Sequence, residues 1–230
     1  MKAIILAAGK GIRMMPLTEN IPKVLVKVNS KPFLWYVIHN LKQAGYDDIG
    51  IVMGYKKEKI QDFLNEYNIK ATLIEQTEQK GTGHAVMQVK NFVKDENFIV
   101  CGGDNLFSIQ DLKAMQIDDN LCHVMGKKIE DPRKYGILIV DNNKLVKIIE
   151  KPPTIIGDMV NIGLYKFTKE IWPALEKIQL SPRGEYEITD AISLLAKEKK
   201  VDVLTLKNYW LDLGSKEDIP KVEEFLTNHF

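Results

Sequence analysis

Short apolar runs alternate with longer amphipathic stretches through the first half of the chain. The apolar runs predict buried strands, because strands covered on both faces carry hydrophobic side chains at successive positions. These runs lie at residues 2–7, 49–53, 71–75, 98–101 and 121–125. The stretches between them predict helices at residues 32–45, 56–67, 83–89 and 112–117. Strands that alternate with helices predict an α/β fold with a doubly wound, mostly parallel sheet.

The pattern changes after residue 126. Residues 136–140 and 145–149 flank the polar turn Asp141-Asn-Asn143 and predict a β-hairpin. Further strands are predicted at 159–167, 201–206 and around Trp210, and helices at 170–178, 189–199 and 215–226. We therefore predict one domain over residues 1–230, with a parallel-sheet lobe at 1–126 and a mixed-sheet lobe with the C-terminal helix at 127–230.

The composition and net charge of the chain argue against some classes of binding partner. The chain is 45% hydrophobic and 27% charged, as is usual for a globular protein, and its formal net charge is +1. A near-neutral balance lacks the basic footprint of proteins that bind nucleic acid or anionic membranes, and we expect neither partner. No signal segment or long apolar stretch is present, so we expect a cytoplasmic protein, with Cys101 and Cys122 as buried free thiols.

Three glycine-rich turns follow predicted strands: Gly9-Lys-Gly11, Gly81-Thr-Gly-His-Ala85 and Gly102-Gly-Asp-Asn105. Ligands of doubly wound sheets bind at the carboxyl ends of strands, and glycine lets backbone N–H groups approach anionic oxygens. The turns therefore predict one cleft for an anionic ligand. The first turn is not a P-loop, and Met14 stands where a dinucleotide-binding loop has its third glycine, which argues against a P-loop NTPase and a dehydrogenase.

Two isolated acids, Asp104 and Asp212, are candidate Mg²⁺ ligands. Magnesium takes one or two carboxylates and completes its shell with phosphate oxygens and water. Sequence spacing alone leaves open whether the two meet, since either also fits a turn or a helix cap. The histidines have no zinc-binding spacing and no nucleophile elbow is present, which argues against zinc and serine-hydrolase chemistry.

Longer motifs carry a family resemblance. Leu6-Ala-Ala-Gly-Lys-Gly-Ile-Arg-Met14, Pro16-Leu-Thr18, Pro22-Lys-Val-Leu25 and Lys31-Pro32 form one extended N-terminal signature. With Gly103-Asp-Asn105, Tyr135-Gly136 and Glu150-Lys-Pro152, they make the chain resemble the sugar-1-phosphate nucleotidylyltransferases over nearly its full length. The implied fold is the Rossmann-like nucleotide-diphospho-sugar transferase fold with a mixed-sheet sugar-binding lobe.

The resemblance implies a role for each matching position. Arg13 and Lys23 would be the catalytic cations on the triphosphate, and Asp104 and Asp212 would carry Mg²⁺ as the cofactor. The implied nucleotide-binding residues are Leu6, Ala8, Gly9, Gln76, Gly81, Thr82 and Gly103. The implied sugar-phosphate-binding residues are Gly136, Glu150, Lys151 and Asn161.

The implied reaction is nucleotidyl transfer from UTP or dTTP to glucose 1-phosphate or N-acetylglucosamine 1-phosphate, with release of pyrophosphate and formation of an NDP-sugar. Two sets of motifs resemble different branches of the family, so the choice between UTP and dTTP and the identity of the sugar stay open. Gln76, Gln79 and residues 81–85 resemble the acetylglucosamine uridylyltransferases, whereas residues 183–190 and 210–212 resemble the glucose thymidylyl- and uridylyltransferases. A homo-oligomer is a further implication of the family. The 230 residues hold no left-handed β-helix hexapeptides, so no fused acetyltransferase is expected.

Two alternatives remain open from the sequence. A non-catalytic regulatory subunit that binds nucleotide sugar should have lost Arg13, Lys23 or one of the aspartates, and all of them are present. A cytidylyltransferase for an alcohol phosphate such as phosphocholine would share the first glycine loop. The Gly81 loop and Glu150-Lys151 favour a sugar instead.

Overall fold

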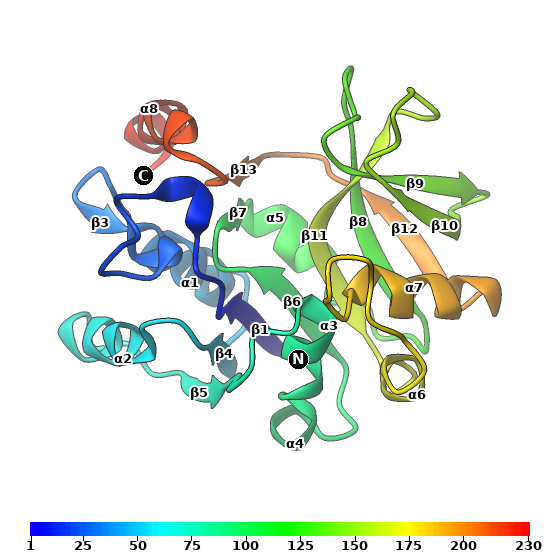
Figure 1. Cartoon of the computed structure of the whole chain (residues 1–230), viewed down its shortest axis with the longest axis horizontal. Helices are drawn as coiled ribbons and strands as arrows, with labels where there is room; N and C mark the ends of the chain where they lie inside the picture. The colour runs from blue at the N-terminus through cyan, green and yellow to red at the C-terminus, as the bar shows by residue number, and fades with distance from the viewer.

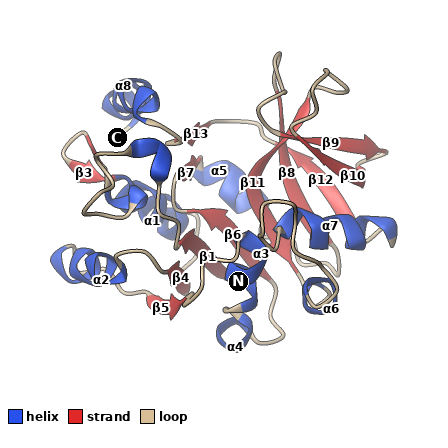
Figure 2. Cartoon of the chain, viewed as in Figure 1, coloured by secondary structure: helices blue, strands red, loops and turns tan.

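A single nine-stranded sheet runs through the molecule in the computed structural model, which describes all 230 residues (Figures 1 and 2). The strand order is β5-β4-β1-β6-β11-β8-β12-β10-β9. The strands are β1 (Lys2–Ala7), β4 (Ile49–Met53), β5 (Thr72–Glu75), β6 (Phe98–Gly102), β8 (Cys122–Lys128), β9 (Gly136–Asp141), β10 (Lys144–Glu150), β11 (Met159–Phe167) and β12 (Val201–Thr205). Two short ribbons accompany the sheet, one formed by β2 (Lys27–Val28) with β3 (Lys31–Pro32) and the other by β7 (Asn105–Phe107) with β13 (Trp210–Asp212).

Helices cover both faces of the sheet. They are α1 (Phe33–Gln43), α2 (Lys57–Glu66), α3 (Thr82–Met87), α4 (Lys90–Val93), α5 (Ile109–Ala114), α6 (Ile171–Leu175), α7 (Ile188–Lys197) and α8 (Ile219–His229), with short 3-10 turns at Ile12–Met14, Lys23–Leu25 and Lys216–Asp218. Successive β1 side chains enter different cores: Ile5 packs with α1, α2, α5 and α8, and Ile4 packs with α3, α4, α6 and α7. The predicted doubly wound α/β fold is confirmed.

The first half of the sheet is parallel and the second half is mixed. Strands β4, β1 and β6 run parallel, with β5 parallel to β4 at the edge. Strand β11 then pairs antiparallel with both β6 and β8. Since β9 pairs with β10 and also with β11, the last five strands close on themselves at the side of the molecule away from α1 and α2 (Figure 1). The division into lobes at residue 126 stays a prediction, and β8 runs across it.

Most predicted elements are present, and the differences have local causes. The helix predicted at 112–117 begins earlier, because Ser108 is its N-cap and accepts a hydrogen bond from the Asp111 N–H. The predicted 215–226 helix starts as a 3-10 turn before α8, which carries Pro220 in its first turn. Both cysteines are buried and unpaired, as expected. No helix has the length and apolar character that crossing a membrane requires.

A buried carboxylate ties the segment before β13 to α5. Asp111 is 2% exposed and accepts a hydrogen bond from the Ser108 hydroxyl at 2.6 Å. Its two oxygens also accept the backbone N–H groups of Lys207 at 2.9 Å and Asn208 at 3.0 Å. Hydrogen bonds to a buried charge are stronger than neutral ones. Asp111 therefore holds the chain at the point where it enters β13.

Replacing Asp111 with alanine should lower the free energy of unfolding by about 2–4 kcal/mol, since two backbone N–H groups and the buried Ser108 hydroxyl lose their acceptor. Urea denaturation of the full chain measures this. Asp62→Ala, at an aspartate whose side chain is 67% exposed, is the control and should change stability by less than about 0.5 kcal/mol. Equal stabilities of the two variants would contradict the anchoring role.

Candidate active site

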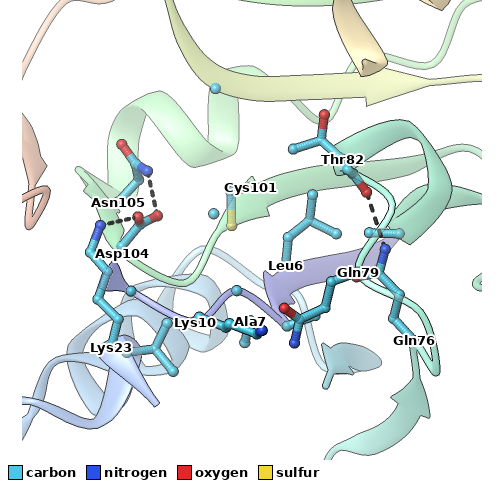
Figure 3. A pocket seen from close by; sticks show the side chains of 18 of the residues that line it. Leu6, Ala7, Lys10, Lys23, Gln76, Gln79, Thr82, Cys101, Asp104 and Asn105 are labelled. Carbon is cyan, nitrogen blue, oxygen red and sulfur yellow. Dashed lines mark hydrogen bonds and ion pairs between the residues drawn. The ribbon is translucent and has the colours of Figure 1, made fainter. Parts of the chain in front are cut away.

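A cavity of about 600 Å³ opens where β1, β5 and β6 end, beside the middle of β11. All three predicted glycine turns contribute to its lining, through Gly9, Gly81 and Gly102. Figure 3 shows Asp104 and Lys23 at one end of this cavity and Gln76 and Thr82 at the other. The cavity therefore has an acidic and cationic end and a glycine- and amide-lined end, as the position of the turns predicts.

The first glycine loop keeps its backbone open to a ligand. Gly11 has a φ of 63°, and a Cβ there would lie 2.7 Å from the Cβ of Lys23. The Gly11 carbonyl accepts a hydrogen bond from the Thr18 hydroxyl at 2.8 Å, which holds the loop in this shape. A Cβ on Gly9 would meet no atom within 4 Å, so this glycine borders open space. A ligand can therefore approach the backbone closely at Gly9.

Gln76 lies buried at the other end of the cavity. It is 4% exposed and its amide nitrogen donates to the Gly81 carbonyl at 3.1 Å and lies 3.0 Å from Nδ1 of His84. No protein donor reaches its amide oxygen. Gly81 has a φ of 94°, and a Cβ there would lie 2.7 Å from the Tyr186 carbonyl, so only glycine fits. Thr82 lines the cavity while its hydroxyl accepts the Ile188 N–H at 3.1 Å.

The two predicted acids, Asp104 and Asp212, meet near Lys23, at the opposite end of the cavity from Gln76. Antiparallel pairing of β7 and β13 places Asp212 opposite Asn105, and the Leu213 N–H donates to the Asp104 carbonyl at 2.9 Å. Burial, followed by the negative charge of Asp104, raises the pKa of Asp212 to about 6. Lys23 Nζ lies 2.7 Å from Oδ2 of Asp104. Two neighbouring carboxylates repel each other, so a cation bound between them would lower the free energy of the ionised pair.

This donor set fits Mg²⁺. No cluster of three or more His, Cys, Asp or Glu side chains converges anywhere in the chain. A site with two carboxylates beside an open cavity leaves room for phosphate oxygens and waters, which magnesium prefers to an all-protein cage. Arg13 lines the same cavity and makes no hydrogen bond or ion pair with the protein. Its guanidinium is therefore free for an anionic ligand.

The predicted sugar-phosphate residues form a second group next to the cavity. Glu150 pairs with Gly136 across the β9–β10 hairpin, and a Cβ at Gly136 would lie 2.9 Å from Oε1 of Glu150. Asn161 donates from Nδ2 to the Tyr165 hydroxyl at 2.8 Å. Burial and then the charge of Glu150 raise the pKa of Tyr165. Tyr165 lines the cavity, so its hydrogen bond links Asn161 to the cavity wall.

The structure brings most of the predicted residues together. Those that line the cavity are Leu6, Ala8, Gly9, Arg13, Lys23, Gln76, Gly81, Thr82 and Asp104. Those that lie outside its lining are Gly103, Gly136, Glu150, Lys151, Asn161 and Asp212. The backbone N–H of Gly103 donates to the Leu6 carbonyl at 2.9 Å, so this glycine joins β1 to the acidic turn.

Some lining residues are not among those predicted. Asn105 lines the cavity beside Asp104, and its place in the Gly-Gly-Asp-Asn turn was the available signal. Lys10 lies in the first glycine turn and also lines the cavity. Tyr165 and Gly163 come from the middle of the long strand β11, where an apolar pattern hides them. A one-dimensional pattern does not show which strand residue faces a ligand.

Comparison with known proteins identifies the family of this chain. The model of the nucleotidyl transferase family matches residues 2–229. The chain belongs to this family. It is 40% identical over 227 residues to the bifunctional protein GlmU of Methanocaldococcus jannaschii, covering 98% of this chain and 54% of that relative. The chain thus spans about half the length of the first curated relatives it matches.

Two further relatives are similar over almost their whole length. The UTP–glucose-1-phosphate uridylyltransferase AglF of Haloferax volcanii is 36% identical over 235 residues, covering 98% of this chain and 96% of AglF. A Bacillus anthracis structure, assigned as a glucose-1-phosphate thymidylyltransferase, superposes with a TM-score of 0.87 at 26% identity, covering 98% of this chain and 94% of that one. The resemblance to the sugar-1-phosphate nucleotidylyltransferases and the fold it implies are confirmed.

The pKa of Asp212 generates a prediction for stability. An unfolded aspartate titrates near 3.8, and the folded group near 6, so the folded state binds more protons between these values. Stability from this group is therefore greatest below about pH 4 and falls as the pH rises to 6. In EDTA, Asp212→Asn should match the unsubstituted chain near pH 4 and exceed its free energy of unfolding by about 3 kcal/mol at pH 7. Urea titrations across this range measure the difference, and curves that stay parallel would contradict it.

Proposed function

We propose that this chain transfers a nucleotidyl group from UTP or dTTP to a sugar 1-phosphate, releasing pyrophosphate and forming an NDP-sugar. The observation that carries the proposal is the convergence of Asp104, Lys23 and Arg13 at one end of a cavity whose other end is lined by Gln76, with Asp212 next to Asp104 outside the lining. A phosphoryl-transfer site needs clustered charged side chains, and a site for a pyrimidine base needs polar groups that bond the edge of the base. Here the charged side chains and the Gln76 amide lie in one cavity, at a spacing set by the sheet.

The glycine loop and Gln76 suit the nucleoside. The base and ribose would lie against the backbone of Leu6, Ala8 and Gly9, where Gly9 leaves open space. The amide oxygen of Gln76 has no protein donor and can accept the N3–H of uracil or thymine. Cytosine has no hydrogen at N3, so this acceptor selects against it. The Gly81 carbonyl accepts a hydrogen bond from the Gln76 amide nitrogen and so holds the amide in this orientation. The held amide oxygen supports a preference for UTP or dTTP over CTP.

Charge neutralisation and alignment carry the reaction. A sugar phosphate is already an anionic nucleophile, so its oxygen can attack the α-phosphorus in line without a serine or a strong base. Arg13 can form two parallel hydrogen bonds to phosphoryl oxygens as charge develops, and Lys23 adds a point charge. Bound Mg²⁺, held by Asp104 and Asp212, would neutralise triphosphate charge. Lys23 neutralises part of the Asp104 charge already, at 2.7 Å.

The second lobe would hold the sugar phosphate. Glu150 and Asn161 offer oxygen acceptors to sugar hydroxyl groups, with Gly136 leaving space beside the Glu150 carboxylate. Lys151 follows Glu150 directly, and its backbone N–H donates to the Tyr135 carbonyl at 3.1 Å. Its ammonium group would pair with the sugar phosphate.

The named relatives order the substrates to be tried. AglF is a UTP–glucose-1-phosphate enzyme by name, and GlmU and the Bacillus anthracis protein represent two other branches. We therefore place UTP with glucose 1-phosphate first, and dTTP and N-acetylglucosamine 1-phosphate next. The proposal includes a cytoplasmic location, on the ground of the free thiols, and a homo-oligomer, which is expected from the family.

Pyrophosphate release tests the proposal over a grid of nucleoside triphosphates and sugar 1-phosphates with Mg²⁺. Glucose, N-acetylglucosamine, galactose and mannose 1-phosphates supply the acceptors, and phosphocholine with CTP is the alcohol-phosphate arm. Turnover with UTP or dTTP and one sugar supports the proposal. Turnover only with CTP and phosphocholine, or no turnover while nucleotide sugar still binds, would replace it with the cytidylyltransferase or the regulatory subunit.

Arg13→Ala should lower kcat roughly 100-fold and change the KM for the nucleotide less, because the guanidinium meets charge that grows in the transition state. Arg133→Ala is the matched control, since Arg133 is exposed and paired with Asp131 at 2.7 Å. Steady-state kinetics with the best substrate pair measures both. An unchanged kcat in Arg13→Ala would contradict the assignment.

Glu150→Ala should raise the KM for the sugar 1-phosphate roughly tenfold or more and affect kcat less, since the carboxylate binds hydroxyl groups in both ground and transition states. Glu130→Ala, at an exposed glutamate of the same lobe, serves as the control. The assignment would be wrong if the KM for the nucleotide rose and that for the sugar 1-phosphate stayed constant.

A further inference from the structure

Asn105 and Trp210 have no role in the reaction described above, yet they form a chain of hydrogen bonds that ends on Asp104. We propose that Asn105 is a positioning residue that fixes the Asp104 carboxylate for its cation, and that Trp210 sets the orientation of the Asn105 amide. The proposal rests on the proposed function, because it takes Asp104 to be a Mg²⁺ ligand.

Both oxygens of Asp104 are held by different neighbours. Asn105 Nδ2 donates to Oδ1 at 2.8 Å, and Lys23 Nζ donates to Oδ2 at 2.7 Å (Figure 3). The plane of the carboxylate is therefore set by two contacts on opposite oxygens. A ligand that displaces Lys23 from Oδ2 finds this oxygen already aimed, because the contact from Asn105 to Oδ1 remains.

The asparagine amide needs an external group to define its orientation. Trp210 Nε1 donates to Oδ1 of Asn105 at 2.6 Å. An indole N–H is a donor only, so the oxygen of the amide must face Trp210 and its NH₂ must face Asp104. The reversed amide would place two oxygens together at Asp104 and two N–H groups together at Trp210. Trp210 thus determines that Asn105 meets Asp104 as a donor.

The same contact links the two strands that carry the acids. In the β7–β13 ribbon Asn105 lies opposite Asp212, and Trp210 is two residues away on the same face as Asp212, within diagonal reach. The Trp210 ring is itself held edge-on by Tyr135, with centroids 5.8 Å apart. A hydrogen bond between Trp210 and Asn105 therefore fixes the strand of Asp212 relative to Asp104.

Gly102 leaves the space that this arrangement needs. A Cβ at position 102 would lie 2.5 Å from Oδ1 of Asp104 and 2.8 Å from Nδ2 of Asn105. Any side chain here would push apart the donor and acceptor of that hydrogen bond. Groups that orient metal ligands typically change metal affinity by 10- to 100-fold when removed. We expect losses at the lower end of that range, since Lys23 and the β-ribbon also restrain Asp104.

The decisive variant is Trp210→Phe, which removes one N–H group and keeps an aromatic ring. Its matched control is Trp172→Phe, because the Trp172 indole N–H is buried and has no hydrogen-bond partner. Free Mn²⁺ is followed by electron paramagnetic resonance as the metal is titrated into the full chain without nucleotide. Trp210→Phe should bind Mn²⁺ roughly tenfold more weakly, and Trp172→Phe should bind as the unsubstituted chain does.

A double-mutant cycle separates positioning from general damage. Asn105→Ala should weaken Mn²⁺ binding about as much as Trp210→Phe, and the double variant should lose no more, because Trp210 acts through Asn105. Losses that add would overturn the proposal. Should Trp210→Phe fail to fold by thermal melting, Asn105→Ala carries the test, and Mn²⁺ affinity unchanged in it would overturn the proposal.

Asp104→Asn distinguishes failure of this inference from failure of the metal assignment. If Mn²⁺ binding depends on Asp104 but Trp210→Phe equals Trp172→Phe, the positioning role is overturned and the proposed function stands. If Asp104→Asn binds Mn²⁺ as well as the unsubstituted chain, the metal assignment fails and this proposal fails with it. Kinetics adds an independent outcome: a higher Mg²⁺ concentration should restore kcat in Trp210→Phe, and a lasting loss of kcat at saturating metal would contradict a positioning role.

Discussion

The antiparallel pairing of β7 with β13 is the constraint on which the site depends. These three-residue strands are separated by about a hundred positions in the chain, and their pairing puts Asp212 beside Asp104. The hydrogen bonds of Asp111 to the backbone of Lys207 and Asn208 hold the incoming segment where this pairing begins. A ribbon this short has little stability of its own, so it needs a buried anchor to stay in register.

The buried carboxylate of Asp212 makes the acidic group beside the cavity costly to ionise. Burial and the nearby charge of Asp104 raise the pKa of Asp212 to about 6, which means that ionising it costs folding free energy. Lys23 compensates part of this charge at Oδ2 of Asp104. The same repulsion would favour a bound divalent cation in the site that we propose.

The two lobes share one sheet, which explains how distant motifs act together. Strand β11 from the second half pairs directly with β6 from the first, so Tyr165 lines the cavity that the glycine loops form. Asn161 donates a hydrogen bond to the Tyr165 hydroxyl, and neither Asn161 nor Glu150 is part of the cavity lining. The glycine turns that line the cavity are thus built on the parallel strands. Glu150 and Asn161, which we propose bind the sugar phosphate, lie on the hairpin and on β11.

The parallel core could be predicted from the sequence, because apolar runs and glycine turns are local patterns that report burial and strand ends directly. The apolar run at 2–7 and the glycines after it located the loop that lines the cavity. The family motifs pointed to Asp104 and Asp212, but their meeting is visible only in the folded chain, since it depends on the β7–β13 pairing. The tertiary structure also decided the contacts of Trp210 and Asn105 with Asp104. Long-range pairing is set by packing over the whole fold, and no spacing along the chain records it.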